Sequence, residues 1–510
     1  MDFRSILGTS DTRRLALVEK LYYRREGLSS DELLGELNCS LPILLNDIEL
    51  INEQHSYYQI NKTKGLYRLE IDQKVNLGNV YADTLNRSPE FQIIEELLYE
   101  QCDSITSLSK KLYLSTSNTQ RALKKIEKTL SQAGMELCYR PLRIEGKESE
   151  IRTFYYRFYS ERQNAFESAL PNLTPSQYNV IESYVAEFVE VNDIWRKYVF
   201  QKYLVYNIYI SLWRIKNHHS YPKEELRTTG IKLPFDRSYK ELKSVVKEIC
   251  EIDLRPYILQ DCLWPTFSDA IVFSIAHREL AMTDNPKYQK LFMRHYELVN
   301  EYNIMLGHQL SKQDMIDLTT VLCNDFYLCD PDGQFIGVLW RNRQDFLNEV
   351  QKVYARGMKR VRHLVERFVN KYQMYQEKDY IQNYTYLLIT TVIDSLEWLA
   401  SQDHALKALL LSDLTPTEES FLAKQIQEYV YGNITIYHFE QLSVGTVQLL
   451  DELKKYDCLI TTGSSEGLPE DFPVVVIDPF LTSQSTRLIQ QMVSDIAEEK
   501  DDATTESFNE

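Results

Sequence analysis

A run of short polar side chains opens a predicted helix near residue 116. The candidate residues are Ser115, Thr116, Ser117, Asn118, Gln120 and Arg121. Asn and Gln side chains can pair with adenine, and Arg with guanine, when a helix end enters the major groove of DNA. Short side chains also let the backbone come close to the bases. This stretch is therefore a candidate for contacts with base edges.

Basic side chains surround the same stretch. Residues 109–128 contain six basic side chains and one acidic one, Glu127, which gives a local net charge of +5. Because DNA phosphates bind Lys and Arg, we predict backbone contacts from Lys110, Lys111, Lys124, Lys125 and Lys128. A charged run often marks only a solvated helix face, and that interpretation stays open at the level of sequence.

The elements around this stretch form a recognisable order. Leu123, Ile126 and Leu130 repeat at helical spacing, and Ser115 is a suitable N-cap. An amphipathic helix is predicted over 89–102, the segment SITSLSKKLYLS predicts a helix and a turn, and ELCYRPLRIEG predicts a strand pair. Helix, helix, third helix and hairpin make a winged helix-turn-helix, in which the third helix enters the major groove.

A similar unit precedes this one. Helices are predicted over 12–25, over a segment with Leu33, Leu34 and Leu37, and over 41–53, where Ser40 is the expected N-cap and Pro42 lies in the first turn. The segment YYQINKTKGLYRLEI then predicts a hairpin with its turn at 61–65. The first two units are therefore an internal duplication.

The first unit is less suited to DNA than the second. Its third helix carries Asp47, Glu49 and Glu53 and no basic residue, so phosphates would repel it. Direct groove contact and a mainly structural role both remain open for this helix. In the hairpin, Lys62, Lys64 and Arg68 could reach a DNA backbone.

Composition indicates several domains, most of them helical. The chain has 510 residues, with only 16 Gly and 15 Pro, and domains usually contain about 100 to 200 residues. Residues 149–402 read as two helical blocks, whereas short β-branched runs alternate with helical stretches beyond 402, as in a small parallel α/β sheet. The final DDATTESFNE lacks a periodic face, so we expect it to be disordered.

Charge is distributed unevenly along the chain. The formal net charge is −17, of which residues 1–160 contribute only −1. The acidic excess therefore lies outside the predicted DNA-binding units. This distribution is compatible with binding to nucleic acid, although the net charge of the whole chain alone would argue against it.

Several other classes of protein find no support in the sequence. There is no P-loop, no dinucleotide-binding glycine motif, no HExxH and no zinc-like cysteine spacing, so we expect no enzyme activity, cofactor or metal. The nine histidines belong to no nucleophilic constellation, and lone helical histidines are usually structural. No signal peptide or membrane span is evident, and the eight scattered cysteines fit a reducing, cytoplasmic location.

The order of these parts resembles the Mga-type virulence regulators, a family that includes the anthrax toxin activator. The resemblance rests on SLSKKLYLSTSNTQRALKKIEKTL followed by LRIEGKESEIR, then two helical blocks and a small α/β domain. It implies six parts. They are a first winged helix-turn-helix at 1–75, a second and main DNA-binding unit at 76–160, phosphotransferase-system regulation domains at 161–288 and 289–402, a domain similar to a sugar-permease IIB component at 403–498, and a disordered acidic tail at 499–510.

The resemblance also implies partners and a regulatory site. These are promoter DNA, a second copy of the chain bound through the C-terminal region, the phosphocarrier protein and RNA polymerase. His277 matches a phosphorylated histidine of the first regulation domain. The earlier acceptor position, within YLVYNIYISLWRIK, holds Tyr or Asn207, and VLCNDFYL in the second domain has no histidine. Where a IIB component has its cysteine, this chain has Ser412 and Asp413.

The sequence thus predicts a DNA-binding transcriptional regulator, an activator of virulence or carbohydrate-linked genes. Two alternatives stay open. An RNA-binding antiterminator would share the regulation domains but begin with a small β-rich domain, unlike the helical units here. A phosphotransfer component would share the α/β domain but needs the missing cysteine.

Overall fold

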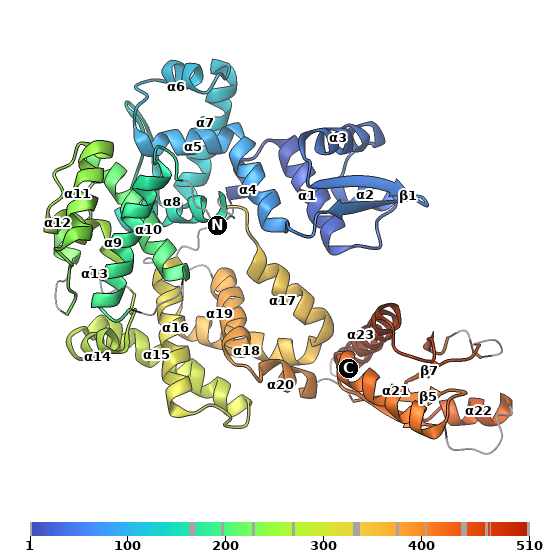
Figure 1. Ribbon diagram of the computed structural model, residues 1–510. Helices are drawn as coiled ribbons and strands as arrows, with labels where there is room; N and C mark the ends of the chain where they lie inside the picture. Colours follow the sequence, from blue (N-terminus) through green and yellow to red (C-terminus); the bar gives the residue numbers. More distant parts are fainter. Residues whose placement is uncertain are drawn as a thin grey trace. The chain divides into compact units, whose positions relative to one another are not determined.

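The computed structural model describes residues 3–162, 170–194, 198–226, 230–267, 271–329, 337–373, 377–402, 405–439, 446–464, 468–469 and 471–506. They form two compact units, Met1–Met293 with Cys323–Arg341, and Arg294–Leu322 with Asn342–Glu510. Named strands occur in two N-terminal hairpins and one C-terminal sheet, and helices make up most of the rest of the described chain (Figure 1). The predicted class, mainly helical and multidomain, is confirmed.

The N-terminal part contains the three helices and the hairpin predicted for the first unit. After the short η1 (Phe3–Ile6) come α1 (Thr9–Tyr23), α2 (Ser30–Leu37), α3 (Leu41–Gln54), β1 (Tyr58–Thr63) and β2 (Leu66–Ile71). The strands pair antiparallel, with Thr63 opposite Leu66. Lys64 and Gly65 make the turn with positive φ angles, which glycine adopts without strain.

A helix that the sequence analysis missed, α4 (Leu77–Arg87), follows this hairpin. Gly, Asn, Asp and Thr weaken its intrinsic helix propensity, so its stability comes from packing against α1, α5 and α8. Leu77, Val80 and Leu85 are buried in that packing, and the Tyr81 hydroxyl donates to Glu19 at 2.6 Å.

The second unit then repeats the same order of elements. It consists of α5 (Pro89–Tyr99), α6 (Ile105–Lys111), α7 (Thr116–Gln132), β3 (Glu136–Tyr139) and β4 (Leu142–Glu145). The strands form an antiparallel hairpin in which Tyr139 lies opposite Leu142. All the elements predicted for this unit are present.

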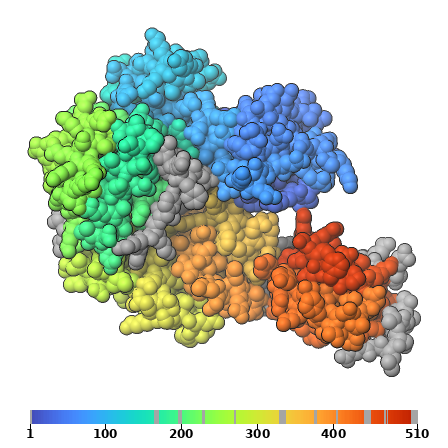
Figure 2. All heavy atoms as spheres, in the orientation of Figure 1, coloured from blue at the N-terminus to red at the C-terminus, as the bar shows by residue number. Residues whose placement is uncertain are grey.

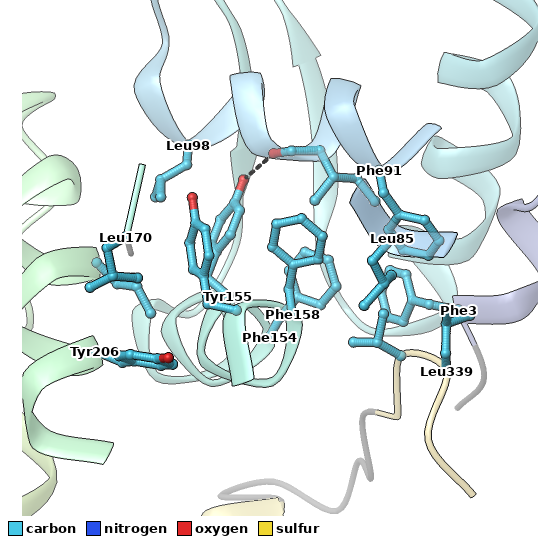
Figure 3. Close-up of a cluster of buried hydrophobic side chains, with 14 of the residues drawn as sticks. Phe3, Leu85, Phe91, Leu98, Phe154, Tyr155, Phe158, Leu170, Tyr206 and Leu339 are labelled. Carbon is cyan, nitrogen blue, oxygen red and sulfur yellow. Dashed lines mark hydrogen bonds between the residues drawn. The ribbon is translucent and has the colours of Figure 1, made fainter. Parts of the chain in front are cut away.

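The core of the first compact unit is built around α8 (Glu148–Arg162). Phe154, Tyr155 and Phe158 are fully buried, and Figure 3 shows them among side chains from several other elements. The Tyr155 hydroxyl donates to the carbonyl oxygen of Ile94 on α5 at 3.1 Å. Because α8 runs across residue 160, the expected boundary there falls inside a continuous core.

The remaining helices of this unit precede residue 285. They are α9 (Pro175–Val191), α10 (Tyr198–Lys216), η2 (Lys223–Glu225), α11 (Arg237–Cys250), α12 (Pro256–Cys262), α13 (Trp264–Phe267) and α14 (Ile275–Asp284). Residues 337–341 also belong to this unit and lie against α8. There the buried carboxylate of Glu161 accepts backbone N–H groups of Val338 and Trp340 at 3.1 and 2.9 Å. Residues 289–402, which the sequence analysis predicted as one domain, contain parts of both compact units.

The second compact unit contains a group of packed helices. Its divisions from the first unit fall within α15 (Pro286–Met305) and α16 (Lys312–Cys329), and it continues with α17 (Asn342–Val353), α18 (Ala355–Tyr372), α19 (Glu377–Thr391) and α20 (Ser395–Gln402). His295 is 1% exposed, and its Nε2 lies 2.7 Å from the Tyr384 hydroxyl. This histidine is therefore buried and in contact with a tyrosine of a neighbouring helix.

A four-stranded parallel sheet forms the C-terminal part, as predicted. Its strands are β5 (Leu406–Leu411), β6 (Ile434–His438), β7 (Cys458–Thr461) and β8 (Val474–Val476), in the order β6-β5-β7-β8. Side chains of α21 (Pro416–Tyr429) and α23 (Ser483–Glu506) pack on one face of the sheet, and those of α22 (Thr446–Leu453) on the other. The result is a three-layer α/β arrangement.

The last helix differs from the expectation of a disordered tail from residue 499. α23 continues to Glu506, and only residues 507–510 of that tail lie outside the described chain. The Lys500 ammonium group pairs with Asp457 at 2.7 Å, which holds the last part of the helix against the residue that precedes β7. None of the helices in the described ranges is long and apolar enough to cross a membrane.

Candidate nucleic-acid interface

Side-chain hydrogen bonds stabilise the start of α7. The Ser115 hydroxyl accepts the N–H of Asn118 at 3.1 Å, so Ser115 is a true N-cap, as predicted. One turn into the helix, the buried Thr119 hydroxyl accepts from the Ser109 hydroxyl of α6 at 2.9 Å. The first bond caps α7, and the second joins α7 to α6 at a buried point.

The polar candidates lie on the outside of α7. Ser117, Arg121, Lys124 and Lys128 follow one another at spacings of four, three and four residues and are all exposed, so they share one helix face. Gln120 is exposed beside them, whereas Leu123, Ile126 and Leu130 are buried on the opposite side. In the space-filling view this part of the chain is the light-blue group of atoms at the top (Figure 2).

Not every predicted cation is equally available. The Lys111 ammonium group lies 2.5 Å from Glu96 and 3.0 Å from the side-chain oxygen of Gln101. Lys125 lies 3.8 Å from Glu90 and donates to the carbonyl oxygen of Leu7 at 3.3 Å. Lys111 and Lys125 are therefore exposed but already engaged with partners in the chain. Lys110, Lys124 and Lys128 are exposed as well.

Arg121 is partly preorganised. Its guanidinium group donates to the Asn118 side-chain oxygen at 2.7 Å. Asn118 and Arg121 therefore form one polar group at the exposed end of the helix. Thr116 is exposed in the same first turn.

Two exposed residues next to α7 were missed in the sequence analysis. Tyr113, in the turn between α6 and α7, is 96% exposed and has a φ of 55°. Arg140 is exposed at the tip of the β3–β4 hairpin. The RP dipeptide within the predicted hairpin was the signal that could have identified Arg140, because Pro marks a turn.

The third helix of the first unit presents a different surface. Leu41, Ile43 and Leu45 are 43%, 40% and 48% exposed on α3. Asp47, which we expected to repel DNA, is 1% exposed and pairs with Arg13 at 2.5 Å. That expectation was wrong for Asp47, because its partner lies 34 residues earlier in the chain.

The three predicted cations of the β1–β2 hairpin differ in their contacts. Lys62 donates to the Ser30 hydroxyl at 3.2 Å and lies over the ring of Tyr67, and Arg68 donates to the carbonyl oxygen of Glu26 at 2.9 Å. Lys64 is exposed at the turn. Lys62 and Lys64 are therefore both exposed, and Arg68 is partly buried.

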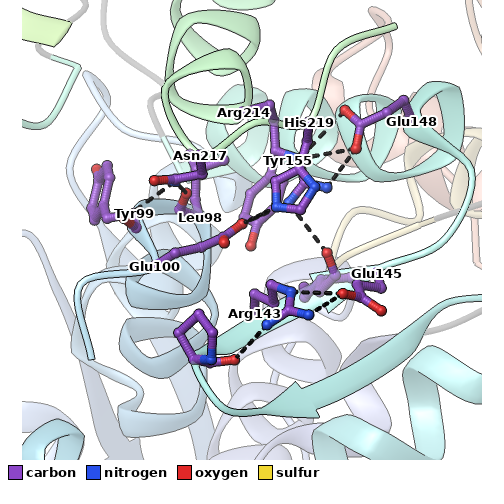
Figure 4. Close-up of polar contacts among 12 residues, drawn as sticks. Leu98, Tyr99, Glu100, Arg143, Glu145, Glu148, Tyr155, Arg214, Asn217 and His219 are labelled. Atoms are coloured by element: carbon purple, nitrogen blue, oxygen red, sulfur yellow. Dashed lines mark hydrogen bonds and ion pairs between the residues drawn. The ribbon is translucent and has the colours of Figure 1, made fainter. Parts of the chain in front are cut away.

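Buried ion pairs join the second winged helix-turn-helix unit to α10 (Figure 4). Arg214 of α10 donates to the Ile144 carbonyl oxygen of β4 at 3.2 Å, to Glu148 of α8 at 2.5 Å and to Glu100 at 3.2 Å. His219 pairs with the same Glu100 at 2.8 Å. The β3–β4 hairpin and α8 are therefore held in place by α10, which lies outside the second winged helix-turn-helix unit.

The candidate phosphoacceptor lies far along the chain from α7. His277 is half-buried in the first turn of α14. Its backbone N–H donates to the Ser274 hydroxyl at 3.1 Å. Burial lowers the pKa of its imidazole below the usual value. The ring is therefore neutral near pH 7, the form in which a ring nitrogen can act as a nucleophile.

The residues that replace the expected cysteine lie after β5. The Ser412 hydroxyl donates to Glu419, which also accepts from His438 Nδ1 at 2.7 Å. Asp413 accepts the hydroxyl of Thr462 at 2.9 Å. Both residues are engaged in hydrogen bonds within the α/β part.

Comparison with known proteins identifies the segment that contains α7. Residues 73–159 match the Mga helix-turn-helix domain. This range includes α4 to α7, the β3–β4 hairpin and most of α8. The matched segment is thus the one that carries the exposed polar and basic face.

Three curated relatives extend the comparison. The capsule synthesis positive regulator AcpA of Bacillus anthracis is 31% identical over 153 residues, 29% of this chain and only 32% of the relative. A putative trans-acting regulator of Streptococcus pneumoniae serotype 4 is 19% identical over 90% of this chain and 92% of the relative. The anthrax toxin expression trans-acting positive regulator of Bacillus anthracis is 29% identical over 107 residues, 21% of this chain and 22% of the relative. The chain therefore contains an Mga helix-turn-helix domain, is similar to the two Bacillus anthracis regulators over part of its length, and is distantly similar to the pneumococcal regulator over most of it.

Proposed function

We propose that this chain is a DNA-binding regulator of transcription whose second winged helix-turn-helix unit makes the main contact. In this proposal α7 enters the major groove, Asn118, Gln120 and Arg121 meet base edges, and Lys124 and Lys128 meet phosphates. The observation that carries the proposal is the exposed basic face of α7. The neighbouring Glu127 accepts from the Tyr139 hydroxyl at 3.0 Å, at the side of that face.

The first unit has an assisting role in this proposal. The exposed start of α3 is apolar, so it offers few donors or acceptors to base edges. The β1–β2 hairpin, with Lys64 at its tip and Lys62 and Arg68 behind it, would contact the DNA backbone instead.

The names of two relatives support positive control of transcription. Both are named positive regulators, one of capsule synthesis and one of anthrax toxin expression. We therefore propose that this chain activates virulence or carbohydrate-linked genes and works together with RNA polymerase. A homodimer formed through the C-terminal region would bring two heads to one promoter and raise their effective concentration.

Phosphorylation by the phosphocarrier protein is a further part of the proposal. His277 is the proposed acceptor because its imidazole is half-buried and neutral. Incubation with phosphocarrier protein, enzyme I and labelled phosphoenolpyruvate should label the wild type and leave His277→Ala unlabelled. Equal labelling of both proteins would contradict the assignment of this residue.

DNA binding is tested by the double variant Arg121→Ala, Lys124→Ala. A duplex selected by the wild type from a random library serves as the probe, and affinity is measured by gel shift at several salt concentrations. We expect at least about 30-fold weaker binding and a salt slope smaller by about 1 to 2, because a guanidinium contact and a phosphate contact are lost.

A matched control removes two exposed cations from another element. Lys240→Ala, Lys247→Ala on α11 makes the same change in net charge. This variant should bind the duplex with nearly wild-type affinity. Wild-type affinity in the Arg121, Lys124 variant would instead refute the proposal.

A further inference from the structure

The helices α17, α18 and α19 of the second compact unit pack against one another (Figure 1). A cavity with many polar lining residues lies among them. Its volume is about 290 Å³, near the lower end of the range for small-molecule sites. From α17 it is lined by Gln344, Leu347, Asn348 and Gln351, and from α19 by Lys378, Ile381, Gln382 and Thr385. Both sets have the spacing of a single helix face, which between packed helices is normally apolar. Here that face is largely polar.

Among the described residues, the charged side chains that line this cavity are all positive. Lys359 and Arg362 of α18 and Lys378 of α19 line it, and no carboxylate is among its lining residues. Glu366 lies one turn beyond Arg362, at 3.3 Å from its Nε, in an exposed pair. Such a pair is weak and uses only part of the five N–H donors of the guanidinium group. Three cations around one small cavity favour a ligand with more than one negative charge.

Thr385 provides an independent sign of a missing partner. Its side chain lines the cavity and is 2% exposed, yet its hydroxyl has no hydrogen-bond partner among the described residues. Helical threonines usually donate to the carbonyl oxygen four residues earlier, and Thr390 on the same helix does so to Tyr386 at 2.8 Å. A buried hydroxyl without a partner is costly, and a ligand hydroxyl in the cavity would satisfy it.

The remaining lining fits a hydroxylated molecule. Amide side chains, such as those of Gln344 and Gln382, both donate and accept hydrogen bonds, as hydroxyl groups require. Leu347, Met358 and Ile381 also line the cavity and could contact the C–H groups of such a molecule. The cavity is also too small for a dinucleotide, since such ligands occupy the larger end of the range.

We propose that this cavity binds a small phosphorylated polyol of the size of a hexose phosphate. Lys359, Arg362 and Lys378 hold the phosphate group, which carries close to two negative charges at neutral pH. The amides and the Thr385 hydroxyl bind the hydroxyl groups of the polyol. This inference concerns the second compact unit alone and does not depend on DNA binding by α7.

Calorimetric titration of the full chain at constant ionic strength tests the proposal. The probes are glucose 6-phosphate, glucose, inorganic phosphate and a short DNA duplex. Glucose 6-phosphate should bind at least about 10-fold more tightly than glucose or inorganic phosphate, because only the phosphorylated sugar uses both sets of groups. Glucose 6-phosphate that binds no better than inorganic phosphate would overturn the proposal.

Exposed cations allow a variant with little risk to folding. Lys359→Gln, Arg362→Gln should weaken binding of glucose 6-phosphate by at least about 10-fold. Arg360→Gln, on the same helix but outside the cavity, should leave it unchanged. Equal binding by the double variant and the wild type would contradict the assigned site. Loss of duplex binding alone in the double variant would assign these cations to DNA instead.

Thr385→Val separates the polyol from the phosphate. It removes one hydroxyl at nearly constant volume, so it should weaken glucose 6-phosphate binding severalfold and leave inorganic phosphate binding unchanged. Because that hydroxyl has no partner in the ligand-free chain, the variant should melt at the same temperature as the wild type or higher. A lower melting temperature with unchanged sugar phosphate binding would show that Thr385 serves folding rather than the ligand.

Discussion

Arg152 and Arg214 show at the scale of single residues how the DNA-binding unit is held. Both are fully buried, at 0% and 1% exposure, and both pair with Glu148. Arg152 also pairs with Asp261 at 2.6 Å. Burial alone would lower the pKa of Arg152, but the carboxylates of Asp261 and Glu148 outweigh it and leave the pKa raised. The guanidinium group is therefore charged, and its loss would strand buried carboxylates.

Replacement of Arg214 by Ala should destabilise the first compact unit by about 3 to 5 kcal/mol, because Glu148 and Glu100 each lose a partner in a buried setting. Urea unfolding measures this change. Arg237→Ala is the matched control, since Arg237 is 91% exposed in its pair with Glu241. That change should leave the free energy of unfolding almost unchanged, because exposed ion pairs contribute little. Similar costs for the two variants would contradict a structural role for the network.

His277 should make stability depend on pH on the acid side. Burial lowers its pKa in the folded chain, so the unfolded chain takes up a proton first as pH falls below about 6.5. Wild-type stability should therefore fall through this range relative to His277→Gln, which does not titrate, whereas above pH 7 the difference between the two should be constant. Unfolding free energies measured from pH 5 to pH 8 test this. A constant difference over the whole range would show that burial does not perturb this imidazole.

At the scale of elements, α7 and α3 differ in how they begin. Both follow a serine that was predicted as an N-cap. The Ser115 hydroxyl caps α7, whereas the Ser40 side chain makes no capping hydrogen bond at α3. The sequence is alike at these two positions, so the difference depends on the surrounding structure.

Ser115→Ala should therefore destabilise its unit by about 1 kcal/mol, the usual effect of losing a capping side chain. Ser40→Ala, the equivalent change at α3, should have a clearly smaller effect. Urea unfolding of both variants provides the comparison. If Ser40→Ala were the more damaging of the two, the assignment of the caps would be incorrect.

Local patterns predicted most elements, and distant contacts account for what they missed. The strong periodicity of α7 and the β-branched runs of the sheet were sufficient to locate these elements. The helix α4 has weak propensity and depends on packing. Asp47 pairs with Arg13, and Glu161 accepts the backbone N–H of Trp340, which lies 179 positions later. Such partners leave no local signal, so the burial of Asp47 and the place of residues 337–341 could not be predicted.

For the candidate site, the sequence predicts residues but does not show which of them already have partners in the chain. All four lysines Lys111, Lys124, Lys125 and Lys128 are exposed, but Lys111 and Lys125 also meet acidic partners on α5. The same limit applies to the cavity near Thr385. Its polar lining comes from three helices whose sequences, taken singly, look like ordinary amphipathic helices.

At the scale of the whole molecule, charge distribution should restrict where DNA can bind. The chain carries −17, but residues 1–160 contribute only −1, and α7 with its preceding turn is positive. An acidic remainder repels duplex DNA and leaves the basic face of α7 as the favourable contact. The central claim is therefore that α7, and not α3, lies closest to the bases.

Photo-crosslinking tests this claim most directly. Gln120 and Leu45 are both exposed and both lie five residues after the serine that precedes their helix. A photoreactive phenylalanine derivative at each position in turn, in the full chain bound to its selected duplex, reports which helix touches DNA. We predict strong crosslinking from position 120 and little from position 45. Crosslinking from position 45 without crosslinking from position 120 would contradict the account.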